Sequence, residues 1–310
     1  MDEIMVSVIC LAYNHEAWIR DALEGFVRQQ APFRFEVLVH DDASTDGTAA
    51  VIREYQERYP QLIRPVYQTE NQYSKGFSPA LAFLAPLIRG RYVAFCEGDD
   101  WWCDPHKLEK QVAALERTPG ADICAHRTMV WKCGDAPGAG RRRGYVAPRL
   151  RRGMLSTEDV IVGGGSRYVA TSSLMCRREA YLEMTPMRKV MINDYVLQLQ
   201  CSARGGMGYL SDCMSVYRTG VPGSWNKRIK GRRGEVRRKT VEMLGVFDDF
   251  TGGRFHAAVE RRLALYASDD LLHGGRLLAM LSPRQMPATI LQLRRTFRKA
   301  LRRIYFHFKQ

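Results

Sequence analysis

Apolar runs alternate with helically spaced apolar positions through the N-terminal half of the chain. Residues 6–13 and 35–43 are rich in β-branched residues, which predicts two buried strands. Apolar pairs at 18/19, 22/23 and 26/27 predict a helix after the first strand, and Ser44 or Thr45 can cap a helix after the second. This alternation is typical of a doubly wound, mostly parallel α/β sheet flanked by helices.

The pattern continues to about residue 96 and ends twice in acidic residues. We predict a weaker strand over 63–68, a helix over 78–88 and a buried strand over 92–96. Ligands bind at the carboxyl ends of the strands in such sheets. We therefore expect the two acidic strand ends, Asp41/Asp42 and Asp99/Asp100, to face one crevice.

The segment YVAFCEGDDWWCDP, residues 92–105, carries the most informative polar residues. Its apolar run stops at four of them, Glu97, Gly98, Asp99 and Asp100. Adjacent carboxylates repel each other, so a divalent cation or a ring of hydrogen-bond donors would stabilise them, and Gly98 would let the backbone approach a ligand. The alternative is an acidic turn before a helix that is capped by Asp104 and begins at Pro105.

Four motifs follow one another along the chain: LAYNHEAWIRDAL, VLVHDDASTDGT, TENQYSKG and YVAFCEGDDWWCDPHKLEKQV. In this order and at these separations they resemble the family 2 glycosyltransferases, which have a GT-A fold. The resemblance is clear over about residues 4–130, looser to about 225, and absent beyond. One departure is Leu11-Ala12-Tyr13-Asn14, where the family commonly has Pro-Thr-Tyr-Asn, so a contact from a Thr hydroxyl to the base cannot be assigned to Ala12.

The resemblance implies a nucleotide-sugar donor and a divalent metal, Mg²⁺ or Mn²⁺. Asp42 matches the residue that binds uracil, although it can instead cap the STDGT turn. Tyr13 matches a residue that stacks on the base, although a buried core Tyr has the same pattern. Asp100 would hold the metal against the donor diphosphate. Asp99 would bind the ribose or sugar and is the second candidate ligand of the metal.

The resemblance also implies a catalytic base and inversion by a single displacement. Asp194 stands at the start of an apolar-periodic segment about 95 residues after the acidic motif and matches the family's base, but a helix-capping Asp would look the same. Glu158 and Asp159 are the next candidates. Residues 168–176, YVATSSLMC, read as a strand whose hydroxyls suit an acceptor pocket.

A late segment, YRTGVPGSW at residues 217–225, resembles the family's loop that closes over diphosphate and acceptor. Arg218 would offset the charge of the leaving group there. The alternative is a basic loop whose side chains are simply solvated.

Composition sets the outer bounds of these predictions. The chain has 310 residues, 45% hydrophobic and 26% charged, enough for one large α/β core with an appendage. Its eight cysteines form no CxxC pair, which favours free thiols in a reducing compartment. The acidic start and the lack of an apolar stretch of 18 residues predict a cytoplasmic protein. We predict a catalytic domain over 1–225, with a nucleotide-sugar half (1–130) and an acceptor half (131–225), and a basic helical region over 226–310.

Basic residues are concentrated in three blocks, at 141–152, 227–239 and 294–309, and the net charge is +14. Such blocks attract anions. The first is predicted to be a mobile loop on the acceptor side, where it meets a lipid diphosphate or stays solvated. Residues 289–310 have the apolar spacing of a helix without acids, which fits either a peripheral helix on an anionic membrane surface or a helix packed on the catalytic domain.

These observations together predict a glycosyltransferase that acts on a glycan or lipid-linked acceptor in surface polysaccharide synthesis. Nucleic-acid binding through the basic blocks is the runner-up, but no nucleic-acid module is recognisable and the acidic crevice would repel phosphates. A catalytically inactive sugar-nucleotide sensor is a third possibility. The intact acids Asp99, Asp100 and Asp194 argue against it.

Overall fold

The computed structural model describes residues 3–134, 139–148, 153–165, 168–224 and 231–273. The strands in these ranges are β1 (Ile4–Ala12), β2 (Arg34–Asp41), β3 (Ile63–Tyr67), β4 (Tyr92–Phe95), β5 (Trp101–Trp102), β6 (Ile123–Cys133), β7 (Gly140–Val146), β8 (Gly153–Leu155), β9 (Met175–Arg177) and β10 (Met207–Thr219). The helices are α1 (Ile19–Val27), α2 (Thr48–Arg58), α3 (Lys107–Glu116), α4 (Thr157–Gly163), α5 (Arg178–Leu182), α6 (Met187–Val190), α7 (Asp194–Ser202), α9 (Arg233–Phe250) and α10 (His256–His273).

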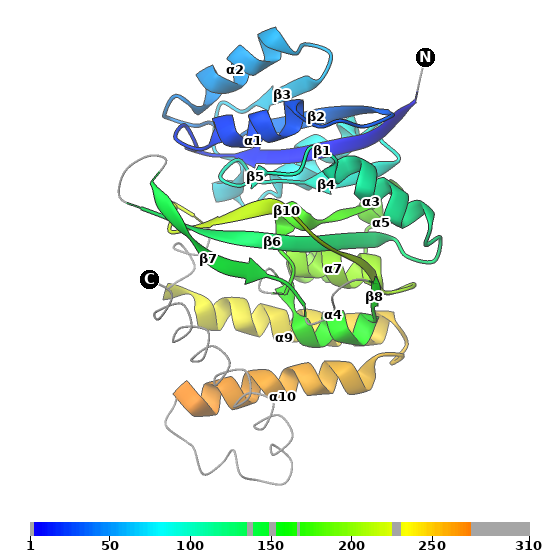
Figure 1. The fold of residues 1–310 in the computed structure, drawn as a ribbon. Coiled ribbons are helices and arrows are strands. Elements are labelled where there is room, and N and C mark those ends of the chain that lie inside the picture. The colour runs from blue at the N-terminus through cyan, green and yellow to red at the C-terminus, as the bar shows by residue number, and fades with distance from the viewer. Residues whose placement is uncertain (1–2, 135–138, 149–152, 166–167, 225–230, 274–310) are drawn as a thin grey trace.

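One sheet runs through the molecule, with strand order β3-β2-β1-β4-β9-β6-β10-β5 (Figure 1). Parallel pairs join β1 to β2 and β4, β2 to β3, and β6 to β10. The short strand β9 is antiparallel to both β4 and β6, so these two strands point the same way. The carboxyl ends of β1, β2, β4, β6 and β10 therefore lie along one edge of the sheet. The predicted largely parallel α/β fold is confirmed.

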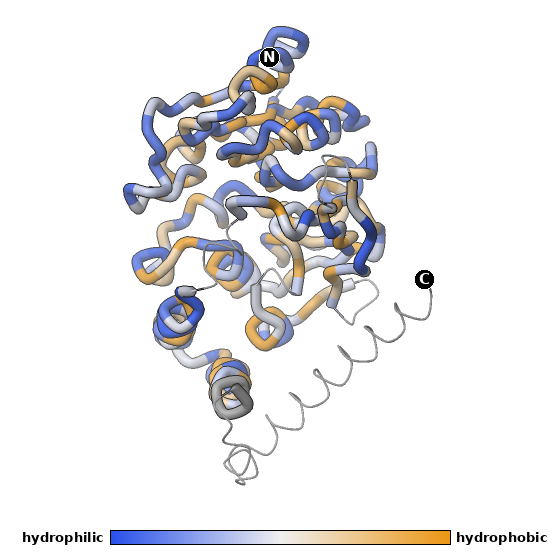
Figure 2. Tube along the Cα trace, turned by 90° about the vertical axis from the view of Figure 1, so that its left-hand side faces the viewer, coloured by the Kyte–Doolittle hydropathy of each residue, from blue (hydrophilic) through white to orange (hydrophobic). Residues whose placement is uncertain are grey.

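Apolar residues fill both faces of the sheet. One apolar cluster joins the strands to the inner faces of α1, α2 and α3, and a second joins them to α4, α5, α7 and α9. Hydrophobic stretches accordingly lie through the middle of the sheet, and hydrophilic ones lie on the outer surfaces of the helices (Figure 2). Met243, Leu244 and Phe247 of α9 are fully buried in the second cluster, which ties this helix to the core.

One predicted helix and one predicted strand have a different secondary structure. Residues 78–88 form a π-helical turn (Ala80–Leu84) followed by a 3₁₀ turn (Ala85–Leu87) instead of an α-helix, because Pro86 has no amide hydrogen to continue one. Most of the predicted strand over 168–176 is irregular. Only its end belongs to β9, after a 3₁₀ turn at Thr171–Ser173.

Helix α2 begins later than predicted, because the local side chains have other partners. The Ser44 hydroxyl accepts a hydrogen bond from the Asn14 amide (2.9 Å), and the Thr45 amide donates to the Asn14 side chain (2.8 Å). The Asp46 carboxylate instead accepts from the Thr48 amide at the helix start (3.0 Å). The prediction that Ser44 or Thr45 caps α2 is therefore wrong.

Helix α3 begins at Lys107, two residues after the predicted start at Pro105. Asp104 still accepts an amide hydrogen bond here, from His106 at 2.8 Å.

The first basic block forms a strand where we predicted a mobile loop. Residues 140–146 pair antiparallel with the end of β6 as β7, so the arginines at 141–143 sit on a β-hairpin. Residues 149–152 and the predicted helix over 289–310 lie outside the residues that the structure describes. Within the described ranges, no helix combines the length and the apolar character that crossing a bilayer requires.

Glu36 of β2 anchors the amino-terminal edge of the sheet. Its carboxylate is fully buried and accepts hydrogen bonds from Ser7 (2.7 Å), from the Arg89 backbone and side chain (3.1 and 2.8 Å), and from Arg64 (2.5 Å). Burial alone would raise the pKa of Glu36, but these hydrogen bonds outweigh burial and lower the pKa.

We predict that Glu36→Gln lowers the free energy of unfolding at pH 7 by about 1–3 kcal/mol, because the amide cannot accept all of these charge-assisted hydrogen bonds. Since folding depresses the Glu36 pKa, its contribution is present above the unfolded-state pKa and is lost as the pH falls through the folded-state value. The difference between wild type and variant, measured by urea denaturation, should therefore shrink at acid pH. Glu57→Gln, at an exposed position on α2, is the control and should change stability by less than about 0.5 kcal/mol. An unchanged unfolding free energy in Glu36→Gln would contradict this account.

Candidate functional site

The acidic turn, residues 97–100, lies directly beyond β4, where the carboxyl ends of β1 and β4 meet. It is closed by a hydrogen bond from the Asp100 amide to the Glu97 carbonyl (3.0 Å), and the Gly98 amide donates to the Leu11 carbonyl of β1 (2.9 Å). A Cβ atom on Gly98 would lie 2.8 Å from both the His15 ring and the Ile19 side chain. Gly98 therefore lets the turn pack closely against the end of β1 and α1, and its predicted approach to a ligand stays a prediction.

Asp100 is the most buried acid of this turn, with 1% of its surface exposed. Its Oδ1 accepts the backbone amide of Arg218 at 2.8 Å, whereas its buried Oδ2 receives no hydrogen bond from any residue that the structure describes. Burial, followed by the charges of Asp99 and Glu97, raises the pKa of Asp100 well above its usual value. A buried carboxylate oxygen without a donor, among other acids, fits an oxygen ligand of a divalent cation.

Glu97 is affected by the charges of the acidic turn and also by the charge of Asp194 at the start of α7. Its pKa is raised to about 8, first by burial and then by the charges of Asp99 and Asp194. Burial and repulsion both disfavour the charged form of Glu97, so a positive charge bound beside it would stabilise the carboxylate.

Asp194 is the first residue of α7, and the helix is capped by its neighbour. The Asn193 side chain accepts the Val196 amide (2.9 Å), so the capping alternative for Asp194 does not apply. The Oδ2 atom of Asp194 is buried and, among the described residues, has no hydrogen-bond donor. Burial raises the pKa of Asp194 to about 6. Glu158 and Asp159, the other candidate bases, are exposed in the first turn of α4.

Tyr217 of β10 belongs to the site but was missed by the sequence analysis. Its pKa is raised by burial and then by four carboxylates, those of Asp100, Glu97, Asp99 and Asp194. One phenol therefore lies within the electrostatic reach of both the acidic turn and the start of α7. The only sequence signal was its position beside Arg218 in the motif at residues 217–225. The first three residues of that motif are the last three of strand β10.

Arg218 connects β10 to the acidic turn and to α1. Its guanidinium donates to the Asp99 carbonyl (2.8 Å), pairs with the Asp21 carboxylate, and lies 4.0 Å from the centroid of the Trp101 ring. Only 8% of the Arg218 surface is exposed, so the alternative of a solvated loop side chain does not apply. Asp21 and Trp101, which hold this arginine, were not predicted as site residues.

The ends of β1 and β2 carry the two residues predicted to bind the nucleobase. Tyr13 is 36% exposed, so it is a surface aromatic and not the core tyrosine of the alternative interpretation. Asp42 is buried, and its carboxylate accepts the amides of Gln72 (2.8 Å) and Tyr73 (3.1 Å) in place of capping the STDGT turn. A carboxylate with two such partners still has lone pairs for a ligand.

Backbone strain marks the same place. Asn14 and Ala43, which directly follow Tyr13 and Asp42, have φ values of 55° and 61°, which are left-handed conformations unusual for residues other than glycine.

Two of the hydroxyls predicted to line an acceptor pocket are part of the core. Ser172 and Ser173 are fully buried, with their hydroxyls bonded to the Ser215 hydroxyl (3.2 Å) and the Ala170 carbonyl (2.6 Å). For these two serines the prediction is wrong, because their hydroxyls are satisfied inside the fold. Tyr168 and Thr171 of the same segment are half-buried, and their part in an acceptor pocket stays a prediction.

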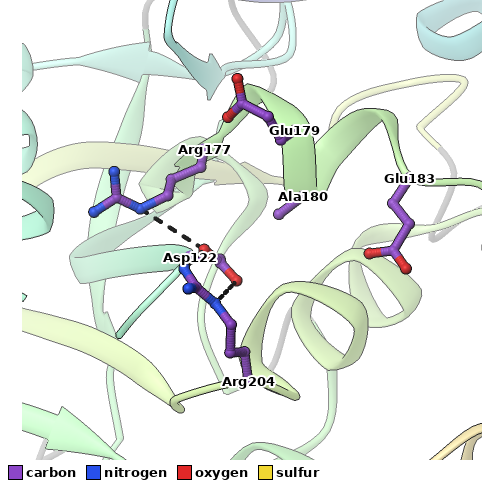
Figure 3. Close-up of a pocket in the computed structure, with 6 residues that line it drawn as sticks. All are labelled: Asp122, Arg177, Glu179, Ala180, Glu183 and Arg204. Atoms are coloured by element: carbon purple, nitrogen blue, oxygen red, sulfur yellow. Dashed lines mark hydrogen bonds and ion pairs between the residues drawn. The ribbon is translucent and has the colours of Figure 1, made fainter. Parts of the chain in front are cut away.

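A surface hollow lies at the opposite edge of the sheet, and Figure 3 shows the side chains that line it. Asp122, immediately before β6, forms ion pairs there with Arg204 and Arg177. The hollow contains none of the predicted site residues, and its most central acid is already neutralised by two arginines. The acidic edge of the sheet therefore remains the candidate site.

Sequence comparisons agree with this architecture. The model of the glycosyl transferase family 2 matches residues 7–184. An uncharacterised protein of Mycobacterium tuberculosis is 36% identical over 229 residues, which is 74% of this chain and 62% of that protein. The UDP-Glc:α-D-GlcNAc-diphosphoundecaprenol β-1,3-glucosyltransferase WfgD of Escherichia coli is 31% identical over 115 residues, 37% of this chain and 42% of that enzyme.

Structural comparisons match most of the chain. Residues 1–349 of TarS from S. aureus, solved in complex with UDP-GlcNAc, superpose with a TM-score of 0.64 at 15% identity, covering 94% of this chain and 80% of TarS 1–349. The mannosyltransferase PcManGT from Pyrobaculum calidifontis, solved with GDP-Man and Mn²⁺, has a TM-score of 0.52 at 21% identity, covering 93% and 84%. At these identities the structures show a common fold. With the family model matching more than half of its residues, the chain belongs to the glycosyl transferase family 2.

Proposed function

We propose that this chain transfers a sugar from a UDP-linked donor to a hydroxyl of a glycan or lipid-linked acceptor, with inversion at the anomeric carbon. The observation that carries the proposal is the environment of Asp194. Its Oδ2 atom is buried, its side chain is not used to cap α7, and its charge raises the pKa of Glu97. A carboxylate with a pKa near 6 is ionised at neutral pH and still basic enough to take a proton.

The donor would lie across the carboxyl ends of β1, β2 and β4. Tyr13 offers an exposed ring to stack on the base, and Asp42 lies at the neighbouring strand end. TarS and PcManGT were solved with nucleotide sugars, and both have this fold.

Asp100, with Asp99 beside it, would hold the divalent cation. The donor-free Oδ2 of Asp100 and the mutual repulsion of the turn's acids make this the best-suited place among the described residues. Mg²⁺ or Mn²⁺ bound there would neutralise the diphosphate and so favour its departure.

The chain's own residues carry out the rest of a single displacement. The acceptor oxygen forms the new bond to the anomeric carbon as the bond to the diphosphate breaks, and the hydroxyl proton passes to Asp194. Arg218 would add positive charge near the leaving group while it keeps the acidic turn in place.

We place this reaction in surface polysaccharide or glycolipid synthesis, at the inner face of a membrane. By its name, the relative WfgD acts on a sugar linked to diphosphoundecaprenol. Such lipids lie in membranes, so an enzyme with a similar acceptor would act at a membrane surface. A peripheral protein whose basic segments meet anionic lipid would suit this location.

We predict that Asp194→Asn reduces kcat by at least ~100-fold while the affinity for UDP persists, because the amide keeps the shape but cannot accept a proton. Because burial raises the Asp194 pKa to about 6, wild-type kcat should rise with pH through about 6, and residual turnover in the variant should lack this step. Transfer assays over pH 5–8 measure both effects. Asp159→Asn is the matched control and should behave as wild type. Near-normal turnover in Asp194→Asn would mean that the base lies elsewhere.

We predict that Asp100→Asn abolishes metal-dependent UDP binding and transfer without unfolding the protein. The amide oxygen can still accept the Arg218 amide, and the substitution removes a repulsive charge from the acidic turn. Isothermal titration of UDP with and without Mn²⁺ measures the first effect, and thermal denaturation without metal should show equal or higher stability. Asp212→Asn, an exposed acid on β10, is the control. Full wild-type activity in EDTA would refute the metal role.

A further inference from the structure

The acidic site raises a difficulty for an acceptor that carries phosphates. Glu97, Asp99, Asp100 and Asp194 lie around one edge of the sheet, and a divalent cation would be shared with the donor diphosphate. An acceptor diphosphate would be repelled from this edge unless other cations lay beside it. The β6–β7 hairpin supplies such cations.

Strand register places these cations next to the site. Thr219 of β10 is opposite Lys132 of β6, and Lys132 is opposite Arg141 of β7. Lys132 therefore lies one strand away from Thr219, the neighbour of Arg218, and Arg141 lies two strands away. Neighbouring strands are about 4.8 Å apart. Both side chains are exposed.

The alternation of side chains along β10 indicates which face these cations share. Arg218 points toward Asp21 and Trp101, so Tyr217 and Thr219 point toward the other face. Tyr217 lies within the field of Asp194 and the acidic turn. Lys132 and Arg141, in register with Thr219, therefore stand on the face of Tyr217 and closer to the edge of the sheet.

Fold stability does not account for this pair. Like charges directly opposite each other on neighbouring strands destabilise a sheet. No ion pair joins Lys132 or Arg141 to a carboxylate in the described parts of the chain, and the adjacent Arg142 and Arg143 add further exposed positive charge. A cationic cross-strand pair without an acidic partner indicates an anionic ligand.

We propose that Lys132 and Arg141 form a binding subsite for the diphosphate of a lipid-linked acceptor. The inference rests on the proposed function, since it names the acceptor of that reaction by its anionic group. Arginine offers a planar fork of donors that fits two phosphate oxygens, and lysine adds a compact charge beside it. The arrangement keeps the two diphosphates apart, with the donor's at the acidic turn and the acceptor's at the hairpin.

The test compares the double variant Lys132→Gln/Arg141→Gln with wild type in the full chain. The probe is geranyl diphosphate, titrated calorimetrically in EDTA so that no divalent cation can hold a diphosphate at the acidic turn. We expect the variant to bind it at least ~10-fold more weakly, with wild-type affinity falling as salt is added. UDP binding with Mn²⁺ should be unchanged, and removal of the like-charge pair should leave thermal stability equal or higher.

A matched control and a second arm decide between the sources of anionic charge. Arg117→Gln/Arg261→Gln removes two exposed arginines elsewhere, Arg117 directly after α3 and Arg261 on α10. This variant should bind geranyl diphosphate as wild type does. Vesicles of phosphatidylglycerol, which carry no diphosphate, test a general membrane contact, and the hairpin variant should bind them as wild type does. The proposal would be overturned if Lys132→Gln/Arg141→Gln bound geranyl diphosphate with unchanged affinity, or if the control variant lost as much affinity. It would also be overturned if Lys132→Gln/Arg141→Gln lost only its binding to the vesicles. If wild type transferred no sugar at all, the proposed function would fail while this binding result could still be read.

Discussion

The mutual repulsion of the carboxylates at the carboxyl edge of the sheet is the constraint around which this site is built. After burial, which is the largest cause, the charges of Asp99 and Asp194 raise the pKa of Glu97, and those of Asp99 and Glu97 raise the pKa of Asp100. Again after burial, all four acids raise the pKa of Tyr217. Arg218 offsets part of this repulsion. By binding the Asp99 carbonyl, the Asp100 carboxylate through its amide, and Asp21 of α1, this one residue attaches the acidic turn to the last strand and to the first helix.

Most of the fold could be predicted from the sequence because its strands are apolar on both faces. The runs that became β1, β2 and β4 are buried on both sides and flanked by amphipathic helices, a pattern with few alternative arrangements. The failures have local causes. Pro86 and the core serines Ser172 and Ser173 act through backbone donors and tertiary hydrogen bonds, which periodicity does not record.

The candidate site could be predicted only in part, because its residues come from segments far apart in the chain. Acids that end a strand, such as Asp99 and Asp100, are visible as breaks in an apolar run. Tyr217 and Asp21 carry no such signal, since an aromatic in a strand and an acid in a helix are ordinary there. Their importance depends on the pairing of β10 with β5 and on the position of Arg218, both products of the tertiary fold.

Charge segregation also explains why one chain can be strongly basic and still have an acidic site. Asp100 is buried beyond the end of β4 and the other three site acids are half-buried, so desolvation strengthens their repulsion and favours a bound cation. The hairpin cations are exposed on the outer strands, where water screens their mutual repulsion more than it would inside the fold. With a cation bound at the acidic turn, the two separated groups of charge would suit two anionic ligands at neighbouring positions, as proposed above.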